Sequence, residues 1–281
     1  MKMRTKEIEA KSILTKSKLP DADYVVNPYT GCPFACLYCY ASFMGKFVGE
    51  SIESWGDYLY VKSNAVQLFA QEFPKLQRNK SNPSILLSSV TDPYNGLELK
   101  YRLTRGILEI ISQSHYKGQI GILTKSPLVM RDLDLFKIMP NVEVGLTITS
   151  TNDKISRFLE VSAPPVTKRL EALHALKKEG VKTYAFLGPL LPHFKLEPCA
   201  LEELIAAVAE TGVNYVYVEH MNLKSYIVSR MADTLKECSS EIQSLYRAAK
   251  FQDHKIEVEN LVLGLLKKYG LKLRLNEVIQ H

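Results

Sequence analysis

The feature that most constrains the fold of this chain is a regular alternation of short apolar segments and amphipathic segments. Six apolar runs are typical of buried strands, at residues 24–26, 84–90, 120–124, 142–148, 181–187 and 215–218. Helical patterns stand between them, at residues 64–74, 103–114, 129–139, 164–178 and 200–211. Repeated strand–helix units of roughly 30 residues predict parallel strands joined by right-handed crossovers.

Six such units are too few to close an eight-stranded barrel. The predicted fold class is therefore α/β, as an open (β/α)6 partial TIM barrel with a C-terminal helical extension. The predicted domains are an N-terminal extension at 1–23, the partial barrel at 24–222 and a C-terminal helical cap at 223–281. We expect Asn64 to cap the first helix and Pro74 to end it.

Three cysteines, Cys32, Cys36 and Cys39, stand at C-x3-C-x2-C spacing in one loop punctuated by glycine and proline. Thiolates on so short a segment either converge on one centre or repel one another, and a metal centre is the usual reason for convergence. A structural zinc site takes four ligands, and no further Cys or His lies within 70 residues of Cys39. Three cysteines would leave one iron of a [4Fe–4S] cluster open to a small molecule. A zinc loop completed by a distant histidine and three unconnected cysteines are the alternatives.

This spacing, with Tyr38 before the third cysteine, resembles the radical S-adenosylmethionine superfamily. The flanking residues, Asn27-Pro28-Tyr29-x-Gly31-Cys32 and Tyr38-Cys39-Tyr40-Ala41, resemble its spore photoproduct lyase-like branch, also called DNA repair photolyase-like. The resemblance implies a [4Fe–4S] cluster on the three cysteines, with S-adenosylmethionine bound to the open iron. One electron then splits a C–S bond of that cofactor, and a 5′-deoxyadenosyl radical takes hydrogen from an unidentified substrate. A small electron donor, flavodoxin- or ferredoxin-like, is the implied partner.

The same resemblance implies that residues at the strand ends bind S-adenosylmethionine. Asp92 would accept from the amino group, Lys125 would pair with the carboxylate, and Gly188 would let the backbone approach the adenine. The implied cofactor-binding set is Tyr38, Ser89, Thr91, Asp92, Lys125, Ser126, Thr147, Ser150, Gly188, Glu219 and Asn222. Ordinary explanations stand beside these, such as an Asp-Pro turn at Asp92 and a solvated lysine at the end of a strand.

The catalytic candidates are Tyr38, Tyr40 and Cys199. Tyr38 and Tyr40 match tyrosines that the lyase uses to return a hydrogen atom to its product. The lyase also uses a cysteine in the loop after its second strand, and residues 88–99 of this chain contain none. Cys199 is a candidate replacement donor, although a buried structural role is commoner for a free cysteine. We therefore expect cofactor cleavage without efficient repair of the thymine photoproduct.

Composition limits the remaining classes. The chain has 36 Lys and Arg against 30 Asp and Glu, and the net charge of +6 is compatible with nucleic acid without pointing to it. Five cysteines, three of them clustered, argue against a disulfide framework and for a reducing compartment. The first residues lack an apolar signal core, and no apolar run approaches the roughly 20 residues of a membrane span. We expect a cytoplasmic protein that does not enter a membrane.

Two function classes stay open at this point. The first is a radical enzyme, favoured by the set of polar strand ends. The second is a non-catalytic iron–sulfur protein that binds nucleic acid or a protein partner. The basic residues of 1–23, which include Lys2, Arg4 and Lys6, are typical of a solvated extension, with a nucleic-acid-facing arm as the alternative.

Overall fold

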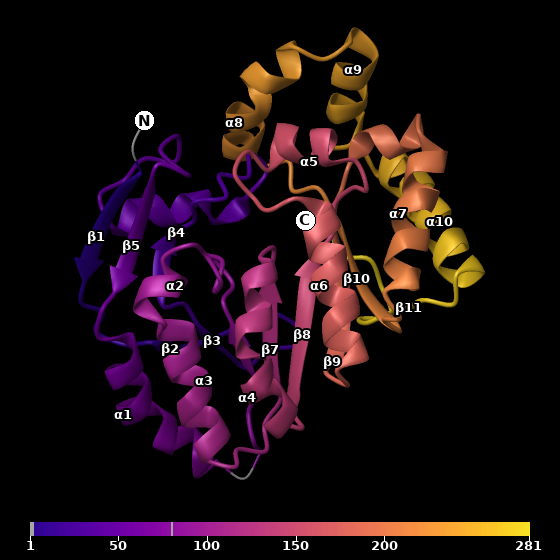
Figure 1. The fold of residues 1–281 in the computed structure, drawn as a ribbon. Helices are drawn as coiled ribbons and strands as arrows, with labels where there is room; N and C mark the ends of the chain where they lie inside the picture. Colours follow the sequence, from indigo (N-terminus) through magenta and orange to yellow (C-terminus); the bar gives the residue numbers. More distant parts are fainter. Residues whose placement is uncertain (1–2, 80) are drawn as a thin grey trace. The chain divides into compact units, whose positions relative to one another are not determined.

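The computed structural model describes residues 3–79 and 81–281, so Lys2, counted above among the basic residues, lies outside the described part. The chain divides into two compact units, whose elements are labelled in Figure 1. Unit 1 comprises Met1–Ala35, Ala41–Gly145 and Lys178–Lys182, and unit 2 comprises Cys36–Tyr40, Leu146–Lys177 and Thr183–His281. The predicted boundaries at 23 and 222 differ from these divisions and stay a prediction.

The main sheet of unit 1 contains the first predicted strands. In spatial order its strands are β2 (Leu14–Lys16), β3 (Tyr24–Val26), β6 (Ile85–Leu87) and β7 (Ile120–Thr124). β2 pairs antiparallel with β3, and the other pairs are parallel. The register pairs Val26 with Leu87 and Leu87 with Ile122. Val26 and Leu87, the last residues of β3 and β6, therefore lie level with Ile122, and β7 continues to Thr124. The polar residues that follow the three strands lie at the same edge of the sheet.

A second, three-stranded sheet in unit 1 was not predicted. Its order is β1 (Arg4–Ile8), β5 (Tyr58–Lys62) and β4 (Tyr29–Gly31). β1 runs parallel to β5 over five residue pairs, and β4 pairs with β5 antiparallel. Residues 4–8 and 14–16, expected only as a solvated extension, are therefore strands, and most of their residues are exposed. Four of the five residues of β1 are exposed, so backbone pairing rather than an apolar face makes this strand, and no alternation marks it in the sequence.

The helices of unit 1 correct two further expectations. Its helical elements are α1 (Ala65–Gln77), α2 (Glu98–Tyr101), α3 (Leu103–Gln113), the 3-10 helix η2 (Pro127–Asp132) and α4 (Leu133–Ile138); η1 (Tyr40–Phe47) begins in unit 2. Pro74 does not end α1. Pro74 and Ala70 are both exposed, so water can reach the Ala70 carbonyl that the proline leaves unbonded. Asn64 does not cap this helix either, because its side-chain amide bonds to the backbone of Ala10.

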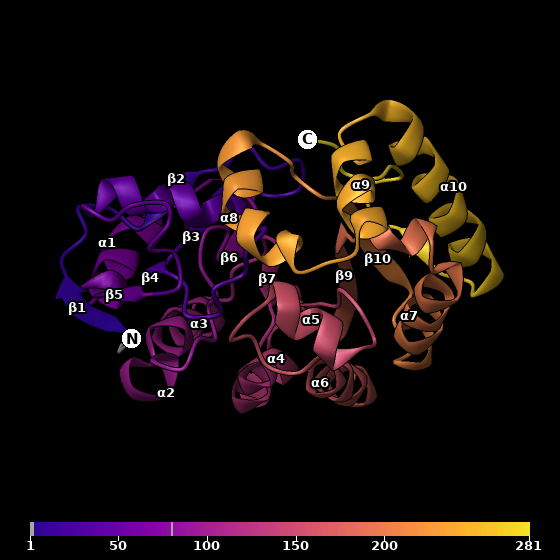
Figure 2. The ribbon, with the colours of Figure 1, turned by 90° about the horizontal axis from the view of Figure 1, so that it is seen from above.

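The strand β8 (Val142–Thr147), buried at all six residues, begins in unit 1 and ends in unit 2. Unit 2 continues the predicted pattern with β9 (Lys182–Leu190), β10 (Tyr215–His220) and β11 (Lys272–Leu273), paired in parallel. Its helical elements are α5 (Asp153–Leu159), α6 (Val166–Lys178), η3 (Pro192–Lys195), α7 (Pro198–Glu210), α8 (Ser225–Lys236), α9 (Ser240–Ala248) and α10 (Gln252–Lys268). α7 packs against α10, as the view from above also shows (Figure 2). All six predicted barrel strands and the three predicted C-terminal helices are confirmed as elements.

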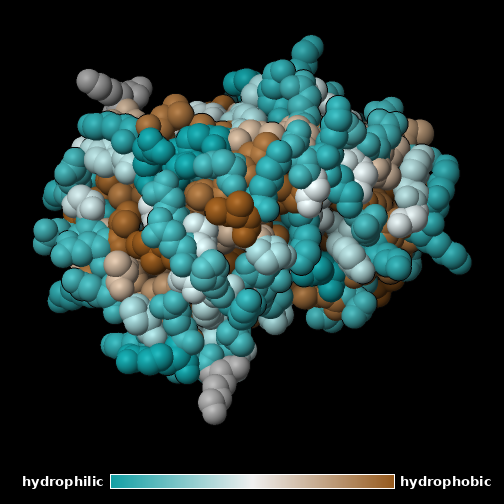
Figure 3. Space-filling view, turned by 60° about the horizontal axis from the view of Figure 1, so that its bottom comes forward, coloured by the Kyte–Doolittle hydropathy of each residue, from teal (hydrophilic) through white to brown (hydrophobic). Residues whose placement is uncertain are grey.

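The surface mixes hydrophilic residues with smaller apolar areas on the face drawn in Figure 3. Among the large apolar side chains, Phe47, Leu99, Ile138 and Phe251 are the most exposed, each above 60%. In the part of the chain that the structure describes, no helix combines the length and the apolarity that crossing a bilayer requires.

Candidate active site

The cysteine loop begins where β4 ends. Gly31, at φ +91°, directly precedes Cys32, and a β-carbon there would overlap the carbonyl oxygen of Tyr58. Only glycine fits this close approach. Cys32 belongs to unit 1, and Cys36 and Cys39 belong to unit 2. None of the three forms a disulfide within the part of the chain that the structure describes; Cys32 and Cys36 are buried and Cys39 is half-buried.

The donor set suits an iron–sulfur centre, because three largely buried cysteines outside any disulfide offer the ligands that such a cluster takes. Over residues 3–79 and 81–281, no three His, Cys, Asp or Glu side chains are already gathered as a metal-holding group. The assignment of the thiols as ligands therefore rests on their spacing in the sequence.

Within unit 2 the cysteine loop is held by a buried charged network. The Tyr38 phenol donates to Glu160 Oε1, Ser156 Oγ donates to Glu160 Oε2 at 2.8 Å, and Arg169 Nη2 donates to Glu160 Oε2 at 2.5 Å. Arg169 and Glu160 are at most 1% exposed. Burial, and then the Glu160 carboxylate, raise the pKa of Tyr38 far above its ordinary value. Tyr38 is therefore a neutral donor whose hydroxyl is committed to the carboxylate.

Arg169 connects this network to the end of a strand. Its Nη1 donates to the Thr147 carbonyl at 3.1 Å and its Nε donates to the Pro164 carbonyl at 2.9 Å. The Leu37 amide donates to the Leu159 carbonyl at 2.8 Å. The segment 36–40 is thus tied to the end of β8 and to the loop after α5. Arg169 was not predicted as a site residue from the sequence. It lies on α6, shortly after Pro164-Pro165, and is buried with the apolar residues of that helix.

Helix α8 also fastens the cysteine loop. Arg230 Nη1 donates to the carbonyls of Cys36 and Leu37, at 3.1 and 2.9 Å, and the Tyr226 hydroxyl donates to the Tyr40 carbonyl at 3.0 Å. Burial is the main cause that raises the pKa of Tyr40, and the Cys39 thiol adds to it. The C-terminal segment therefore contributes directly to the site, although its sequence pointed only to helices.

In unit 1, the residues after β3 and β6 are joined by Asn27. Its Oδ1 accepts from the amides of Ser89 and Val90 at 2.9 and 3.1 Å, and its own carbonyl accepts from Lys62 Nζ at 2.8 Å. Burial lowers the pKa of Lys62. Thr91 Oγ1 donates to the Gly31 carbonyl at 2.6 Å. Ser89 and Thr91 are thereby held beside the start of the cysteine loop.

The structure brings Asp92 and Lys125 together through the backbone amide of Lys125. Asp92 Oδ2 accepts from the Lys125 amide at 2.8 Å, and Oδ1 accepts from Thr124 Oγ1 at 2.6 Å and from the Tyr94 amide at 2.9 Å. Burial raises the pKa of Asp92 and is the largest cause of the shift. The three hydrogen-bond donors act in the opposite direction and lower the pKa, but by less. Ser126 has a structural task, since its Oγ accepts from the Leu128 amide and caps η2.

A buried ionic network stiffens the loop that follows β6. Glu98 and Asp132 have fully buried side chains, and Arg131 pairs with both at 2.8 Å. Arg105 pairs with Asp132 at 2.9 Å, and the Tyr29 hydroxyl donates to Glu98 at 2.5 Å. Breaking one partner of such a network leaves an uncompensated buried charge, so the strand-end residues above it have a rigid support.

In unit 2, Thr147 and Ser150 are buried at the end of β8. Ser150 Oγ accepts from the Asn152 amide at 3.0 Å. Between them, the Thr149 hydroxyl is buried without a hydrogen-bond partner among the described residues. An unpaired buried hydroxyl is costly, and a ribose hydroxyl would satisfy it.

The last predicted site residues have local partners that the sequence did not indicate. A β-carbon on Gly188 would overlap the Phe186 ring, so packing within β9 already requires glycine there. Glu219 Oε1 lies 2.9 Å from His281 Nε2, and Asn222 Oδ1 accepts from the Lys224 amide at 3.2 Å.

Cys199 is exposed, although we expected a buried cysteine there. It lies exposed in the first turn of α7, so the structural role in a buried environment is wrong. The proline at position 198 starts that helix at the surface.

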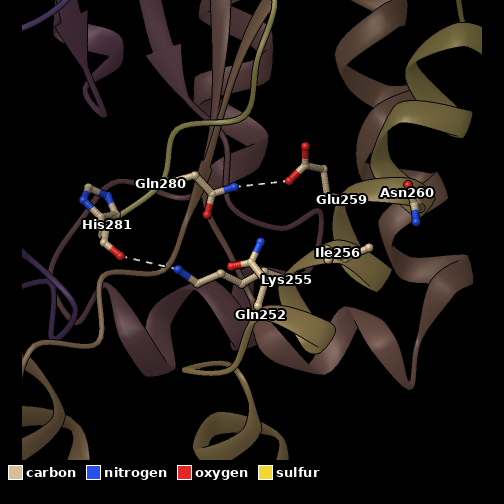
Figure 4. Close-up of a pocket in the computed structure, with 7 residues that line it drawn as sticks. All are labelled: Gln252, Lys255, Ile256, Glu259, Asn260, Gln280 and His281. Carbon is tan, nitrogen blue, oxygen red and sulfur yellow. Dashed lines mark hydrogen bonds between the residues drawn. The ribbon is translucent and has the colours of Figure 1, made fainter.

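A polar pocket of about 440 Å³ lies beside Glu219 and its partner His281. Figure 4 shows Lys255 and Glu259 on α10, and Gln280 and His281 on the C-terminal segment. Lys255 Nζ donates to the His281 carbonyl at 3.4 Å, and Gln280 Nε2 donates to Glu259 at 3.2 Å. The buried side chain of His220 lies 3.5 Å from the same Glu259. Such a local contact with a neighbouring carboxylate is common for a buried histidine.

Comparison with known proteins connects this site to a family. The family model of the radical SAM superfamily matches residues 26–205. Uncharacterized protein MJ0683 of Methanocaldococcus jannaschii is 38% identical over 220 residues, which are 78% of each chain. Uncharacterized protein Rv2578c of Mycobacterium tuberculosis is 26% identical over 280 residues, 94% of this chain and 81% of that one.

Among solved structures, spore photoproduct lyase complexed with dinucleoside spore photoproduct is similar at a TM-score of 0.72 and 17% identity, over 96% of this chain and 81% of that one. A lyase variant with bound AdoMet and the same photoproduct is similar at a TM-score of 0.71. The predicted fold class is confirmed by this likeness. The chain is thus an enzyme that belongs to the radical S-adenosylmethionine superfamily and has the partial-barrel fold of spore photoproduct lyase.

Proposed function

We propose that this enzyme holds one [4Fe–4S] cluster on Cys32, Cys36 and Cys39 and cleaves S-adenosylmethionine reductively. The observation that carries the proposal is the C-x3-C-x2-C spacing of three cysteines, two of them buried, in a chain of this superfamily. A cluster bound there would supply one electron to S-adenosylmethionine. Cleavage of a C–S bond would then give methionine and a 5′-deoxyadenosyl radical.

The protein's own part is to position the loop and exclude water. Tyr38, Glu160 and Arg169 form a buried chain of hydrogen bonds that fixes the segment carrying Cys36 and Cys39. Such a satisfied buried network is rigid. Rigid support is what a site needs when it must hold a reactive radical at one atom of its substrate.

The proposed S-adenosylmethionine contacts form one set in each unit. Unit 1 supplies Ser89, Thr91, Asp92, Lys125 and Ser126, and unit 2 supplies Tyr38, Thr147, Ser150, Gly188, Glu219 and Asn222. The unpaired buried hydroxyl of Thr149 supports a hydroxyl-rich ligand beside the second set.

Lys125 provides the test of this assignment. Replacing Lys125 with Ala removes a charged hydrogen bond to the cofactor carboxylate, which is worth about 1–3 kcal/mol, or a loss of affinity of about 5- to 150-fold. Anaerobic titration calorimetry of S-adenosylmethionine into the reconstituted variant measures it. Lys117→Ala, at an exposed lysine of unit 1, is the control. Wild-type affinity in the Lys125 variant would show that this side chain points elsewhere.

The substrate reaction is proposed to differ from that of the lyase. Tyr38 and Tyr40 are kept, but the segment 88–99 has no cysteine to return a hydrogen atom. Cys199, the candidate replacement, is exposed on α7. We expect cofactor cleavage with little or no repair of the thymine photoproduct.

An anaerobic assay on a dinucleotide carrying that lesion, and on a duplex carrying the same lesion, tests this expectation. Multiple-turnover release of intact thymines would contradict it. The Cys199→Ala variant would then tell whether Cys199 is the donor.

A further inference from the structure

A small groove lies between α8 and α9 in unit 2. Its volume is about 170 Å³, and its lining includes Val228, Met231, Leu235 and Tyr246. Three cations, Lys236, Arg247 and Lys250, also line it, and all three are exposed. Among the described residues that line this α8–α9 groove there is no carboxylate. An apolar floor with a cationic border is complementary to an apolar patch bordered by acidic groups.

The groove and the cysteine loop lie on opposite faces of α8. Tyr226 and Arg230, four residues apart, share one face and donate to the carbonyls of Tyr40, Cys36 and Leu37. Val228 and Leu235 line the groove, and at about 100° per residue they stand on the far side of the helix from that pair. About one helix diameter, on the order of 10–12 Å, therefore separates the groove from the loop that carries Cys36.

We propose that the α8–α9 groove is the docking site of a small acidic electron-transfer protein that reduces the cluster. The proposal rests on the function proposed above, because it assumes a cluster on the cysteine loop. One electron passes from the reduced carrier, which is oxidised by one electron, to the cluster, and no bond or proton is exchanged. Electron transfer slows steeply with distance, so the carrier must bind close to the cysteines. Electron-transfer complexes are also transient and bury little surface, which suits so small a groove.

The charge pattern favours a protein over nucleic acid as the occupant. Lys236 pairs with Asp233 at 2.8 Å, and exposed Glu237 and Glu241 lie on the same stretch of chain. A long polyanion would meet these carboxylates beyond the groove, whereas nucleic acid is bound by extended basic surfaces. A compact acidic partner needs only the three cations at the groove itself.

The test compares two double charge reversals in the anaerobically reconstituted enzyme. Arg247→Glu/Lys250→Glu alters the groove, and Lys267→Glu/Lys272→Glu makes the same charge change at exposed residues of α10 and β11. Stopped-flow absorbance follows cluster reduction by reduced flavodoxin and, separately, by dithionite. We expect the groove variant to be reduced by flavodoxin at least tenfold more slowly, with the dithionite rate and the control variant unchanged. The wild-type flavodoxin rate should also fall as salt is added.

Equal flavodoxin rates in wild type and groove variant would overturn the proposal. Loss of binding to a DNA duplex, with the flavodoxin rate kept, would also overturn it and assign the groove to nucleic acid. If the charge reversal lowers the iron content, Arg247→Gln/Lys250→Gln replaces it, with a smaller slowing expected. If wild type takes up no cluster, the proposed function fails instead; calorimetry of flavodoxin binding to the two variants then still decides the docking site, with weaker binding expected only for the groove variant.

Discussion

Tyr38 stands directly before the third cysteine, and its hydroxyl donates to Glu160 inside unit 2. A side chain so engaged positions the loop, whereas a hydrogen-atom relay needs a hydroxyl directed at the reacting atoms. The relay role of Tyr38 and Tyr40 stays a prediction. The geometry gives Tyr38 a structural task in addition, and that task can be measured without substrate.

The Tyr38→Phe variant should lower the free energy of unfolding by about 1–3 kcal/mol, because the buried Glu160 carboxylate loses a donor. Urea unfolding of the iron-free protein measures the change. Tyr269→Phe is the matched control, since its hydroxyl donates to Glu202 at a much less buried site, and its loss should be smaller. If Tyr38→Phe unfolds at the wild-type urea concentration, the hydrogen bond to Glu160 does not support the loop.

At this scale the sequence pointed to the three cysteines that we propose as ligands, because three residues of one kind at fixed short spacing form a pattern. It did not predict the support. Glu160 and Arg169 lie more than 100 residues after Tyr38 and meet it only in the folded chain. The contacts of Asn27 and Lys62 were not predicted for the same reason, since neither spacing nor periodicity indicates a contact between strands.

Among the elements of unit 2, three carry buried histidines: His193 on η3, His220 at the end of β10 and His254 on α10. Burial is the largest cause of the pKa shift in each histidine and lowers the pKa below the ordinary 6.5. A nearby carboxylate acts in the opposite direction in each case: Glu197 on His193, Glu259 on His220 and Glu257 on His254. Below about pH 6.5 the unfolded chain therefore binds more protons than the folded one. The free energy of unfolding is therefore highest above that pH. It falls as the pH drops toward the pKa values that the histidines have in the folded protein.

We expect the free energy of unfolding to fall between pH 7.5 and 5.5, by at most about 1.4 kcal/mol per pH unit for each histidine. Urea unfolding at several pH values measures the slope. The His193→Gln/His254→Gln variant should flatten it, and His174→Gln, at an exposed position of α6, should not. A slope that the double variant leaves unchanged would assign the pH dependence to other groups.

Element prediction succeeded where burial alternates along the chain, as in β7, whose predicted and observed limits are both 120–124. It failed for β1, whose residues are mostly exposed, because an edge strand held by backbone pairing needs no apolar face. It also failed at Pro74, because an exposed helix surface allows water to replace the bond that proline removes.

For the whole molecule, the succession of strands and helices was enough to predict a partial barrel. The superfamily was predicted from a resemblance carried by the cysteine spacing together with Tyr38. The substrate could not be predicted in the same way, because strand-end loops that bind it vary without changing the fold. The absence of a cysteine in 88–99 is the sequence feature on which the proposed difference from the lyase reaction rests.

The most direct test of the central claim is the formation of 5′-deoxyadenosine from S-adenosylmethionine by the anaerobically reconstituted enzyme with dithionite. Chromatography should detect this product with the wild type, and with Cys238→Ala, a variant of a cysteine outside the motif. Cys36→Ala should form none, because it lacks a cluster ligand. An iron-loaded wild type that forms no 5′-deoxyadenosine, or a Cys36→Ala variant that forms as much as wild type, would contradict the proposed function.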